Sequence, residues 1–129
     1  MNVLLNTHAL IWFLEDAPAL SRRAREVIED GTKTCLVSMA TGWELAIKVA
    51  LGKLHTPIPL RYRFTEELER LHFTVLPIEA RHLHQLLDLP LHQHRDPFDR
   101  MIIAQALSEN LTVVSNDEAF DAYGVQRIW

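Results

Sequence analysis

Five oxygen-bearing side chains that are far apart in the chain could meet in one site. They are Asn6, Glu44, Asp96, Asp99 and Asp117. Each follows the end of a predicted strand or lies near the start of a predicted helix. Because binding sites in open parallel sheets gather at the carboxyl ends of the strands, we expect these side chains to line a single cleft.

Carboxylates that share a cleft repel each other strongly. Two unit charges ~4 Å apart cost about 4 kcal/mol at an effective dielectric constant of about 20. Such a cluster needs protons, neighbouring Lys or Arg side chains, or divalent cations. Oxygen ligands favour Mg²⁺ or Mn²⁺ over zinc, and Mg²⁺ held by carboxylates commonly organises phosphoryl transfer. The residue types therefore predict a Mg²⁺ or Mn²⁺ site for chemistry on phosphate esters.

Short apolar runs that alternate with helical patterns must position these side chains. Strands are predicted at residues 2–6, 34–38, 73–76, 111–114 and 125–128. Helices are predicted at residues 9–16, 22–30, 41–51, 65–71, 78–87, 97–110 and 118–122. This alternation is typical of α/β folds with a parallel sheet. We expect a three-layer α/β/α sandwich with a central, mostly parallel sheet, formed by residues 1–129 as a single domain.

Local signals predict several helix ends. Asp96 is a good N-cap before Pro97, because the missing N–H of proline would have no partner in a first helical turn. Thr7 and Ser21 are predicted to cap the first two helices, and Gly31 is predicted to close the second one. The apolar face predicted for the helix at 41–51 comprises Trp43, Ile47, Ala50 and Leu51.

Composition indicates an ordinary globular protein and excludes a generally basic polyanion binder. The 129 residues are 48% hydrophobic and carry a net charge of −4, so contact with nucleic acid needs a local patch, a metal ion or a partner chain. Cys35 is the single cysteine, which excludes an internal disulfide and suits a reducing compartment. We find no signal-peptide pattern and no apolar run near the ~20 residues that span a bilayer. We therefore expect a cytoplasmic protein.

The chain resembles the PIN-domain nucleases, specifically the ribonuclease toxins of bacterial VapBC-type toxin–antitoxin modules. The segments that carry the resemblance are LLNTHALIW, SMATGWELAIKVALGKL, LPIEARH, LPLHQHRDPFDRMIIAQA and VVSNDEAF. The ordered set spans nearly the whole chain, and DPFDRMIIAQA is its most specific part. By this resemblance, the residues at position 6, Glu44, Asp99 and Asp117 are catalytic and bind Mg²⁺ or Mn²⁺.

Further residues belong to the same resemblance. Asp96 looks like the extra acid of a DPFDR subgroup and is a further candidate metal ligand. Ser115 stands where the family has a small hydroxyl residue, and Thr7 follows position 6 in the family's Asp-Thr-His pattern. Arg95 and Arg100 flank the acids, and they could contact RNA phosphate, contact an antitoxin or balance charge.

One position departs from the family pattern, because Asn6 stands where the family has Asp. An amide offers one neutral oxygen to a metal, but it lacks the charge and cannot accept a proton as a base. Two origins are open: a substitution introduced so that a toxic nuclease can be expressed, or a natural loss that leaves a weak or inactive enzyme. In either case we expect much lower activity than in an Asn6→Asp version.

Each candidate also has a purely structural interpretation. Asp99 could be only a helix-start acid, Asp117 only an N-cap, and Glu44 only a solvated helix acid. For Asp96, capping or support of a neighbouring ligand competes with direct ligation. The spacing of the acids as a set favours the metal site.

Histidines and aromatic residues near these acids favour structural roles. Residues two apart on a helix do not share a face, so His82 and His84 are weak as a metal site. No further motif completes a zinc site for His92 and His94 in the predicted loop. His8 is expected to orient the cleft. The aromatic residues predicted to belong to the core rather than to stack on bases are Trp12, Trp43 and Phe98.

The leading interpretation is a Mg²⁺-dependent endoribonuclease toxin that hydrolyses RNA phosphodiester bonds. A metal-activated water would attack the phosphorus in line, and by resemblance the products carry 5′-phosphate and 3′-hydroxyl ends. The resemblance also implies a cognate antitoxin and a homodimer. The alternatives are a catalytically inactive antitoxin-binding module, which Asn6 favours, an RNA-processing PIN nuclease without antitoxin, and a phosphohydrolase of small substrates.

Overall fold

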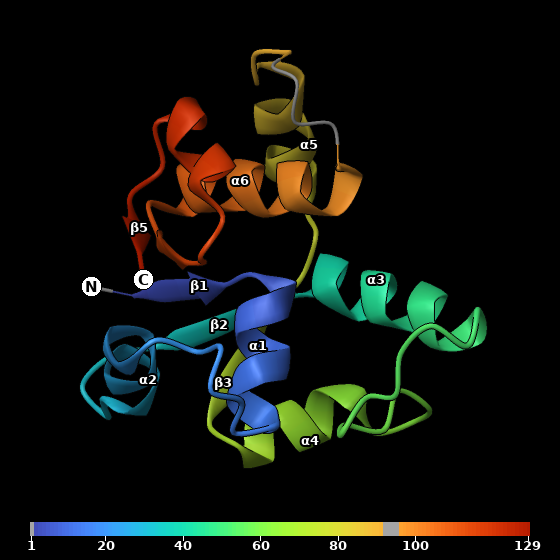
Figure 1. The fold of residues 1–129 in the computed structure, drawn as a ribbon. Coiled ribbons are helices and arrows are strands. Elements are labelled where there is room, and N and C mark those ends of the chain that lie inside the picture. The colour runs from blue at the N-terminus through green and yellow to red at the C-terminus, as the bar shows by residue number, and fades with distance from the viewer. Residues whose placement is uncertain (1, 92–95) are drawn as a thin grey trace.

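A sheet of parallel strands forms the centre of the structure (Figure 1). The computed structural model describes residues 2–91 and 96–129. The strands are β1 (Val3–Leu5), β2 (Cys35–Ser38), β3 (Phe73–Leu76), β4 (Thr112–Val114) and β5 (Arg127–Ile128). Their spatial order is β3-β2-β1-β4-β5, and every neighbouring pair is parallel. The predicted parallel sheet is thereby confirmed.

Helices cover both faces of this sheet (Figure 1). They are α1 (Thr7–Leu14), α2 (Arg22–Glu29), α3 (Met39–Ala50), α4 (Phe64–Arg70), α5 (Ala80–Leu87), α6 (Pro97–Glu109) and the 3-10 helix η1 (Glu118–Tyr123). Helices α1, α2 and α4 pack on one face, and α5, α6 and η1 pack on the other. Helix α3 contacts both α1 and α6. The arrangement is the predicted three-layer α/β/α sandwich. Within the described residues, no helix is both long and apolar enough to cross a membrane.

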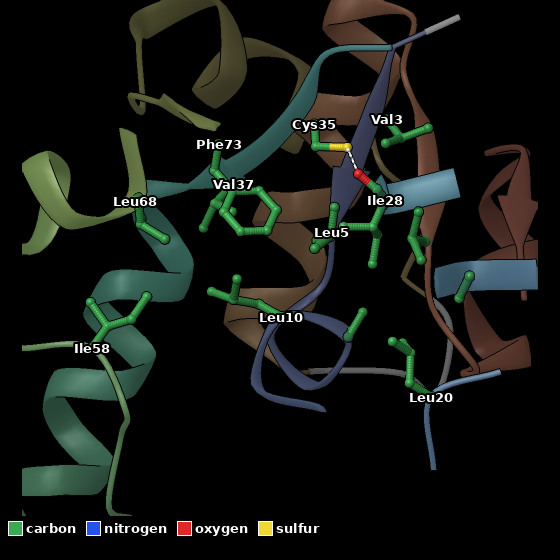
Figure 2. Packing of buried hydrophobic residues seen from close by; sticks show 13 residues of the cluster. Val3, Leu5, Leu10, Leu20, Ile28, Cys35, Val37, Ile58, Leu68 and Phe73 are labelled. Atoms are coloured by element: carbon green, nitrogen blue, oxygen red, sulfur yellow. Dashed lines mark hydrogen bonds between the residues drawn. The ribbon is translucent and has the colours of Figure 1, made fainter. Parts of the chain in front are cut away.

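Alternate side chains of β1 enter two separate hydrophobic clusters. Val3 and Leu5 belong to the cluster beneath α1, α2 and α4 (Figure 2), whereas Leu4 packs against α6 and η1 on the other face. This alternation follows from the pleat, which directs successive side chains of a strand to opposite faces. All three side chains are fully buried. The central strand is therefore held on both faces, and it fixes the position of Asn6, the next residue.

The thiol of Cys35 lies in the first of these clusters (Figure 2) and points toward the carbonyl oxygen of Ile28, 3.5 Å from Sγ. Burial raises the pKa of this thiol. Because a buried, protonated thiol is a poor nucleophile, Cys35 acts here as a small core residue.

Helix caps agree with the sequence patterns except at α1. Ser21 caps α2 as predicted. The N-cap of α1 is Asn6 rather than Thr7, because Oδ1 of Asn6 accepts a hydrogen bond from the backbone N–H of Ala9. Thr7 is instead the first helical residue, and its hydroxyl is used elsewhere. Gly31 follows the C-cap of α2 as predicted, although it does not adopt a positive φ.

The predicted apolar face of α3 is exposed, so the expectation that Trp43 belongs to the core was wrong. Trp43 is 58% exposed and Leu51 is 63% exposed. The helix instead buries its small and polar side, which carries Ala40, Thr41, Gly42, Glu44 and Leu45. It does so because that side faces the start of α1, where the hydroxyl of Thr7 contacts Thr41 and Glu44. Phe98 of α6 is half-buried and meets Trp43 edge-on, with ring centroids 5.0 Å apart.

Candidate active site

The strand order places the candidate site where the chain reverses its direction across the sheet. From β1 the chain proceeds to β2 and β3 on one side, and β4 and β5 lie on the other. In α/β sheets such a reversal opens a crevice at the carboxyl ends of the two strands that adjoin it. Strands β1 and β4 pair with Leu5 opposite Val114. Asn6 after β1 and Asp117 after β4 therefore lie at the same edge.

A cleft of about 630 Å³ occupies this edge. The residues that line it are Asn6, His8, Trp12, Asp99, Asn116, Asp117 and Glu118. Three of the predicted site residues, Asn6, Asp99 and Asp117, thus share one cleft although they come from three separate segments. Glu44 and Asp96 are not among the lining residues.

Asn6 is buried, and both ends of its amide make hydrogen bonds. Its Oδ1 accepts from the backbone N–H of Ala9 at 2.9 Å, and its Nδ2 donates to Oγ of Ser115 at 2.8 Å. Its backbone N–H donates to the carbonyl oxygen of Val114 at 3.1 Å. These bonds hold residue 6 between β1, α1 and β4. An aspartate fits the same position, since its oxygens can accept from the Ala9 N–H and from the Ser115 hydroxyl.

Ser115 connects residue 6 to Asp117. Its fully buried Oγ also accepts from the backbone N–H of Asp117 at 3.0 Å. Asp117 in turn caps η1, because its Oδ1 accepts from the backbone N–H of Ala119 at 2.9 Å. Asp117 is therefore an N-cap, as one interpretation of the sequence held, and it also lines the cleft.

Arg127 of β5 holds the segment after β4 from the other side. Its guanidinium donates to both carboxylate oxygens of Asp121, at 2.8 and 3.0 Å, and to the carbonyl oxygen of Ser115 at 3.1 Å. The hydrogen bond from Arg127 holds the pKa of the Asp121 carboxyl below its usual range. Asp121 belongs to η1, so this bidentate ion pair joins η1 to β5. It thereby restricts the segment that carries Asp117.

Glu44 does not line the cleft and joins α3 to the start of α1. Its Oε1 accepts from the hydroxyl of Thr7 at 2.6 Å, and its Oε2 lies 2.7 Å from Nζ of Lys48. The Glu44 side chain is 8% exposed and that of Lys48 is 37% exposed, so the ion pair is partly buried. The hydroxyls of Thr7 and Thr41 lie 3.1 Å apart. Sequence reasoning missed this ion pair, although the spacing of four residues between Glu44 and Lys48 is the usual signal for one.

The two acids at the start of α6 have different positions. Asp96 is exposed and caps the helix, since its Oδ1 accepts from the backbone N–H groups of Phe98 and Asp99 at 2.9 and 3.0 Å. Pro97 occupies the first helical turn, as predicted. Asp99 is half-buried and lines the cleft. The first acid therefore positions the helix, and the second acid contributes to the cleft.

Arg100, which the sequence placed next to these acids, is not among the residues that line the cleft. Its Nη1 donates to the carbonyl oxygen of Pro90 at 3.1 Å and to the hydroxyl of Tyr123 at 3.3 Å. Its guanidinium also lies 5.9 Å from the centre of the Tyr123 ring. Arg100 therefore ties α6 to η1 and to Pro90 in the segment that follows α5. Three other residues considered from the sequence fall outside the described part of the chain: His92, His94 and Arg95.

The paired histidines of α5 do not share a face, as the helical spacing predicted. His82 is fully buried, and its Nδ1 accepts from the backbone N–H of Glu79 at 3.0 Å. Its Nε2 lies 2.9 Å from Oε1 of Glu109. The side chain of His84 is 83% exposed. His82 therefore fastens α5 to α6 and takes no part in the cleft.

Aromatic side chains line the cleft next to the acids. The sequence associated His8 with the cleft, but it did not predict that Trp12 would line it. His8 is exposed, and Trp12 is half-buried with part of its ring against the first hydrophobic cluster. The predicted core role of Trp12 is therefore confirmed only in part. The signal that could have found this wall is the spacing of four residues between the two rings, which places them on one face of α1.

The acidic residues suit a hard divalent cation by residue type. Carboxylate oxygens of Asp99 and Asp117 are the donors that Mg²⁺ and Mn²⁺ prefer, and Asn6 offers a neutral amide oxygen. Glu44 fits less well, because the Lys48 ammonium lies 2.7 Å from one of its oxygens and would repel a cation. Across residues 2–91 and 96–129, no group of three His, Cys, Asp or Glu side chains is arranged to hold a metal ion. Metal ligation by these residues stays a prediction.

Comparison with known proteins identifies the family. The PIN domain family model matches residues 3–126 of this chain. No curated protein matches the sequence. Among solved structures, VapBC2 from Rickettsia felis, bound to a DNA fragment from its promoter, is similar over 99% of this chain and 98% of its own, with a TM-score of 0.71 and 16% identity.

Two further solved structures have the same fold. FitAcB from Neisseria gonorrhoeae is 22% identical, with a TM-score of 0.65, and the match covers 98% of this chain and 96% of that one. VapBC-1 from nontypeable Haemophilus influenzae is 19% identical, with a TM-score of 0.63, covering 99% and 97% of the two chains. At these identities the structures establish a shared fold, and the match of the family model spans almost the whole sequence. The chain therefore belongs to the PIN domain family, which is a family of nucleases.

Proposed function

We propose that this chain is the toxin of a toxin–antitoxin pair and hydrolyses RNA phosphodiester bonds with the help of Mg²⁺ or Mn²⁺. Membership of the PIN family supports nuclease chemistry. The similar solved structures support the biological setting, because they include VapBC assemblies and a toxin–antitoxin complex from Klebsiella pneumoniae. A cognate antitoxin is accordingly the proposed partner.

The observation that carries the proposal is the shared cleft of Asn6, Asp99 and Asp117 at the carboxyl ends of β1 and β4. Asp99 and Asp117 are the residues proposed to hold a divalent cation there. Such a cation, when bound, supplies a Lewis acid that activates water and stabilises charge on the phosphate. Thr7, the neighbour of residue 6, joins the start of α1 to α3 through its hydrogen bond to Glu44. Ser115 sets the relative position of residue 6 and Asp117.

Asn6 is proposed to make this chain a weak nuclease. Its Nδ2 donates to Ser115, so this end of the side chain can neither accept a proton from water nor bind a cation. Its Oδ1 is neutral and already caps α1. The hydrogen-bonding pattern accommodates Asp in its place, and that carboxylate would add one negative charge to the cleft.

Exposed apolar side chains support the proposed protein partners. Trp43 and Ile47 are exposed on α3, Leu51 is exposed at its C-cap, and Leu83 and Leu87 are exposed on α5. Apolar side chains that gather on a surface commonly mark protein interfaces. We propose that one of these two surfaces, on α3 or on α5, binds the antitoxin. We also propose that the chain forms a homodimer, which would bring two clefts together.

A second function is favoured by Asn6 alone, namely that of a catalytically inactive module that binds an antitoxin. A nuclease of RNA maturation without an antitoxin is the other alternative. The first is separated from the proposed toxin by whether the parent chain itself cleaves RNA in Mg²⁺ or Mn²⁺. The second is separated by whether a neighbouring gene product binds and inhibits the chain.

A cleavage assay tests the proposed function. The parent chain and the Asn6→Asp variant are incubated with end-labelled single-stranded RNA in Mg²⁺, in Mn²⁺ or in EDTA. Because losing one electrostatic contact at a reacting centre typically costs about 10²–10³ in rate, the variant is expected to cleave about 100-fold faster. Cleavage should stop in EDTA, and the products should carry 5′-phosphate ends.

Matched controls make the assay specific. In the Asn6→Asp background, Asp117→Asn should abolish cleavage, whereas Asp88→Asn, an exposed acid at the end of α5, should leave it unchanged. Equal rates for the parent and the Asn6→Asp variant, or cleavage that persists in EDTA, would overturn the proposal.

A further inference from the structure

One wall of the cleft consists of aromatic rings. His8 and Trp12 lie one turn apart on the same face of α1, and both line the cleft with Asn6, Asp99 and Asp117. Their ring centroids are 5.5 Å apart, and their planes are inclined by 33°. The row continues to Trp129, whose ring centroid lies 5.8 Å from that of Trp12.

The row is fixed relative to the acids by the helix that carries it. Asn6 caps α1 and also lines the cleft. The first turns of α1 therefore begin beside the acids of the cleft. At 1.5 Å per residue, Trp12 lies ~9 Å along the helix axis from residue 6. A planar group stacked on this wall would therefore lie within the same cleft as a phosphate near Asp99 and Asp117.

Partial burial of Trp12 suits a rigid stacking surface. Trp12 is half-buried, because part of its ring packs against the first hydrophobic cluster and against Trp129, whereas His8 is exposed. A side chain already held in place loses little conformational freedom on binding. The exposed His8 ring, which lies against the better-held Trp12 ring, is thus available for a ligand at low entropic cost.

Charge explains why such a surface would be needed. The cleft carries the carboxylates of Asp99, Asp117 and Glu118, and the whole chain has a net charge of −4. This charge disfavours a polyanion such as RNA. Stacking of a nucleobase on an aromatic ring does not depend on phosphate charge, and it contributes about 1–3 kcal/mol per base in proteins that bind single strands, so it can offset part of the repulsion.

We propose that His8 and Trp12 form a stacking platform that holds one unpaired nucleobase of the RNA next to the scissile phosphate. The inference rests on the proposed nuclease function and deepens it. A base inside a duplex keeps both faces stacked on its neighbours and cannot use the platform without being extruded. The chain therefore discriminates between single-stranded and duplex RNA at this wall.

A binding titration tests the platform without requiring turnover. The parent chain, which carries Asn6, is titrated in Mg²⁺ against a fluorescently labelled oligoribonucleotide, and anisotropy is recorded. The same strand in a duplex and single strands with one abasic position serve as comparison ligands. Single-stranded RNA should bind at least tenfold more tightly than the duplex, in line with the energy of one stacked base.

The variants separate stacking from packing. Trp12→Leu keeps an apolar side chain against the core but removes the ring, and it should raise the Kd for single-stranded RNA by about tenfold. Trp12→Phe should restore most of the affinity. His8→Ala changes an exposed side chain, so it tests the platform without disturbing the core. Tyr62→Leu, which removes a 94% exposed ring outside the cleft, is the matched control and should leave the Kd unchanged.

The abasic series gives the decisive comparison. One abasic position should weaken binding to the parent chain, and that same position should cause no further loss in Trp12→Leu. Unchanged RNA affinity in folded Trp12→Leu and His8→Ala, or equal affinity for duplex and single strand, overturns the platform.

Failure of the stacking platform can be distinguished from failure of the proposed nuclease function. If the Asn6→Asp variant does not cleave RNA but binding depends on Trp12, the nuclease proposal fails and the base platform stands. If the variant cleaves RNA and RNA binding does not depend on His8 or Trp12, only the platform fails.

Discussion

The side-chain amide nitrogen of Asn6 lies 2.8 Å from Oγ of Ser115, across 109 residues of sequence. The same Oγ accepts the backbone N–H of Asp117 at 3.0 Å. A single buried hydroxyl thus joins the residue after β1 to the acid after β4. The two sides of the cleft behave as one hydrogen-bonded unit, and a change at any of the three positions is expected to affect the others.

Ser115→Ala is expected to lower the free energy of unfolding by about 1–3 kcal/mol, because the buried amide of Asn6 loses its acceptor. Urea unfolding measures the loss. Thr74→Ala, at an exposed position of β3, is the control and should change stability by no more than ~0.5 kcal/mol. Equal, small effects of the two substitutions would show that the hydroxyl does not hold the strand ends together.

Lys48→Met is expected to destabilise the chain, because it leaves the carboxylate of Glu44 buried without its counter-ion. Breaking a fully buried pair costs about 3–5 kcal/mol, and because the Lys48 side chain is 37% exposed, solvent screening reduces the expected loss to about 1–2 kcal/mol. Adding Glu44→Gln removes the uncompensated charge.

The double variant should therefore be more stable than Lys48→Met alone. A double-mutant cycle of urea unfolding tests this, and the expected coupling energy is at least ~0.5 kcal/mol. Strictly additive effects would show that the two side chains do not interact in solution.

The architecture was predictable because its signals are local. Alternating apolar runs and helical patterns predicted the parallel sheet and its helices, and Ser21 and Asp96 predicted helix starts that the structure confirms. The convergence of Asn6, Asp99 and Asp117 followed from the rule that sites lie at the carboxyl ends of parallel strands. Each of these inferences needed only the sequence near one element and a general rule of topology.

Features that depend on how elements meet were not predictable. Which face of α3 is covered depends on where α1 and α6 arrive, so Trp43 was wrongly placed in the core. The contacts of Ser115 with Asn6 and Asp117 depend on the register of β1 against β4. Asn6 displaces Thr7 as the cap of α1 because the Thr7 hydroxyl donates to Glu44, which lies in another helix.

Substitutions at Asp96 separate capping from metal ligation. Asn and Asp are about equally good N-caps, whereas replacement by Ala costs roughly 0.5–2 kcal/mol. Asp96→Asn should therefore preserve thermal stability, and Asp96→Ala should lower it. In the Asn6→Asp background, RNA cleavage by the Asp96→Asn variant should be unchanged. Loss of cleavage in a stable Asp96→Asn variant would assign Asp96 a direct role in the site.

Glu109 is expected to contribute acid-sensitive stability. Its carboxylate accepts hydrogen bonds from His82 and Arg81, and these bonds hold its pKa below the ordinary value of 4.5, with His82 as the largest cause. A carboxyl group whose pKa is depressed by folding stabilises the native state above its unfolded pKa. This contribution is lost as the pH falls through the folded pKa.

The pH dependence of urea unfolding measures this contribution. Between about pH 5 and pH 3 the parent chain should lose more stability than the Glu109→Gln variant does, because the variant lacks the titrating group. Glu26→Gln, an exposed position of α2, makes the same charge change without these partners and should follow the parent. Identical pH profiles for the parent and Glu109→Gln would contradict the assignment.

Direct binding of Mn²⁺ tests the central claim that residue 6, Asp99 and Asp117 form one cation site. Titration followed by electron paramagnetic resonance measures free Mn²⁺ against the Asn6→Asp variant, the parent, and the Asn6→Asp variant that also carries Asp99→Asn and Asp117→Asn. The account predicts the tightest binding for Asn6→Asp, at least tenfold weaker binding for the parent if residue 6 supplies about 1.4 kcal/mol, and no site in the triple variant. Equal Mn²⁺ affinity in all three proteins would contradict it.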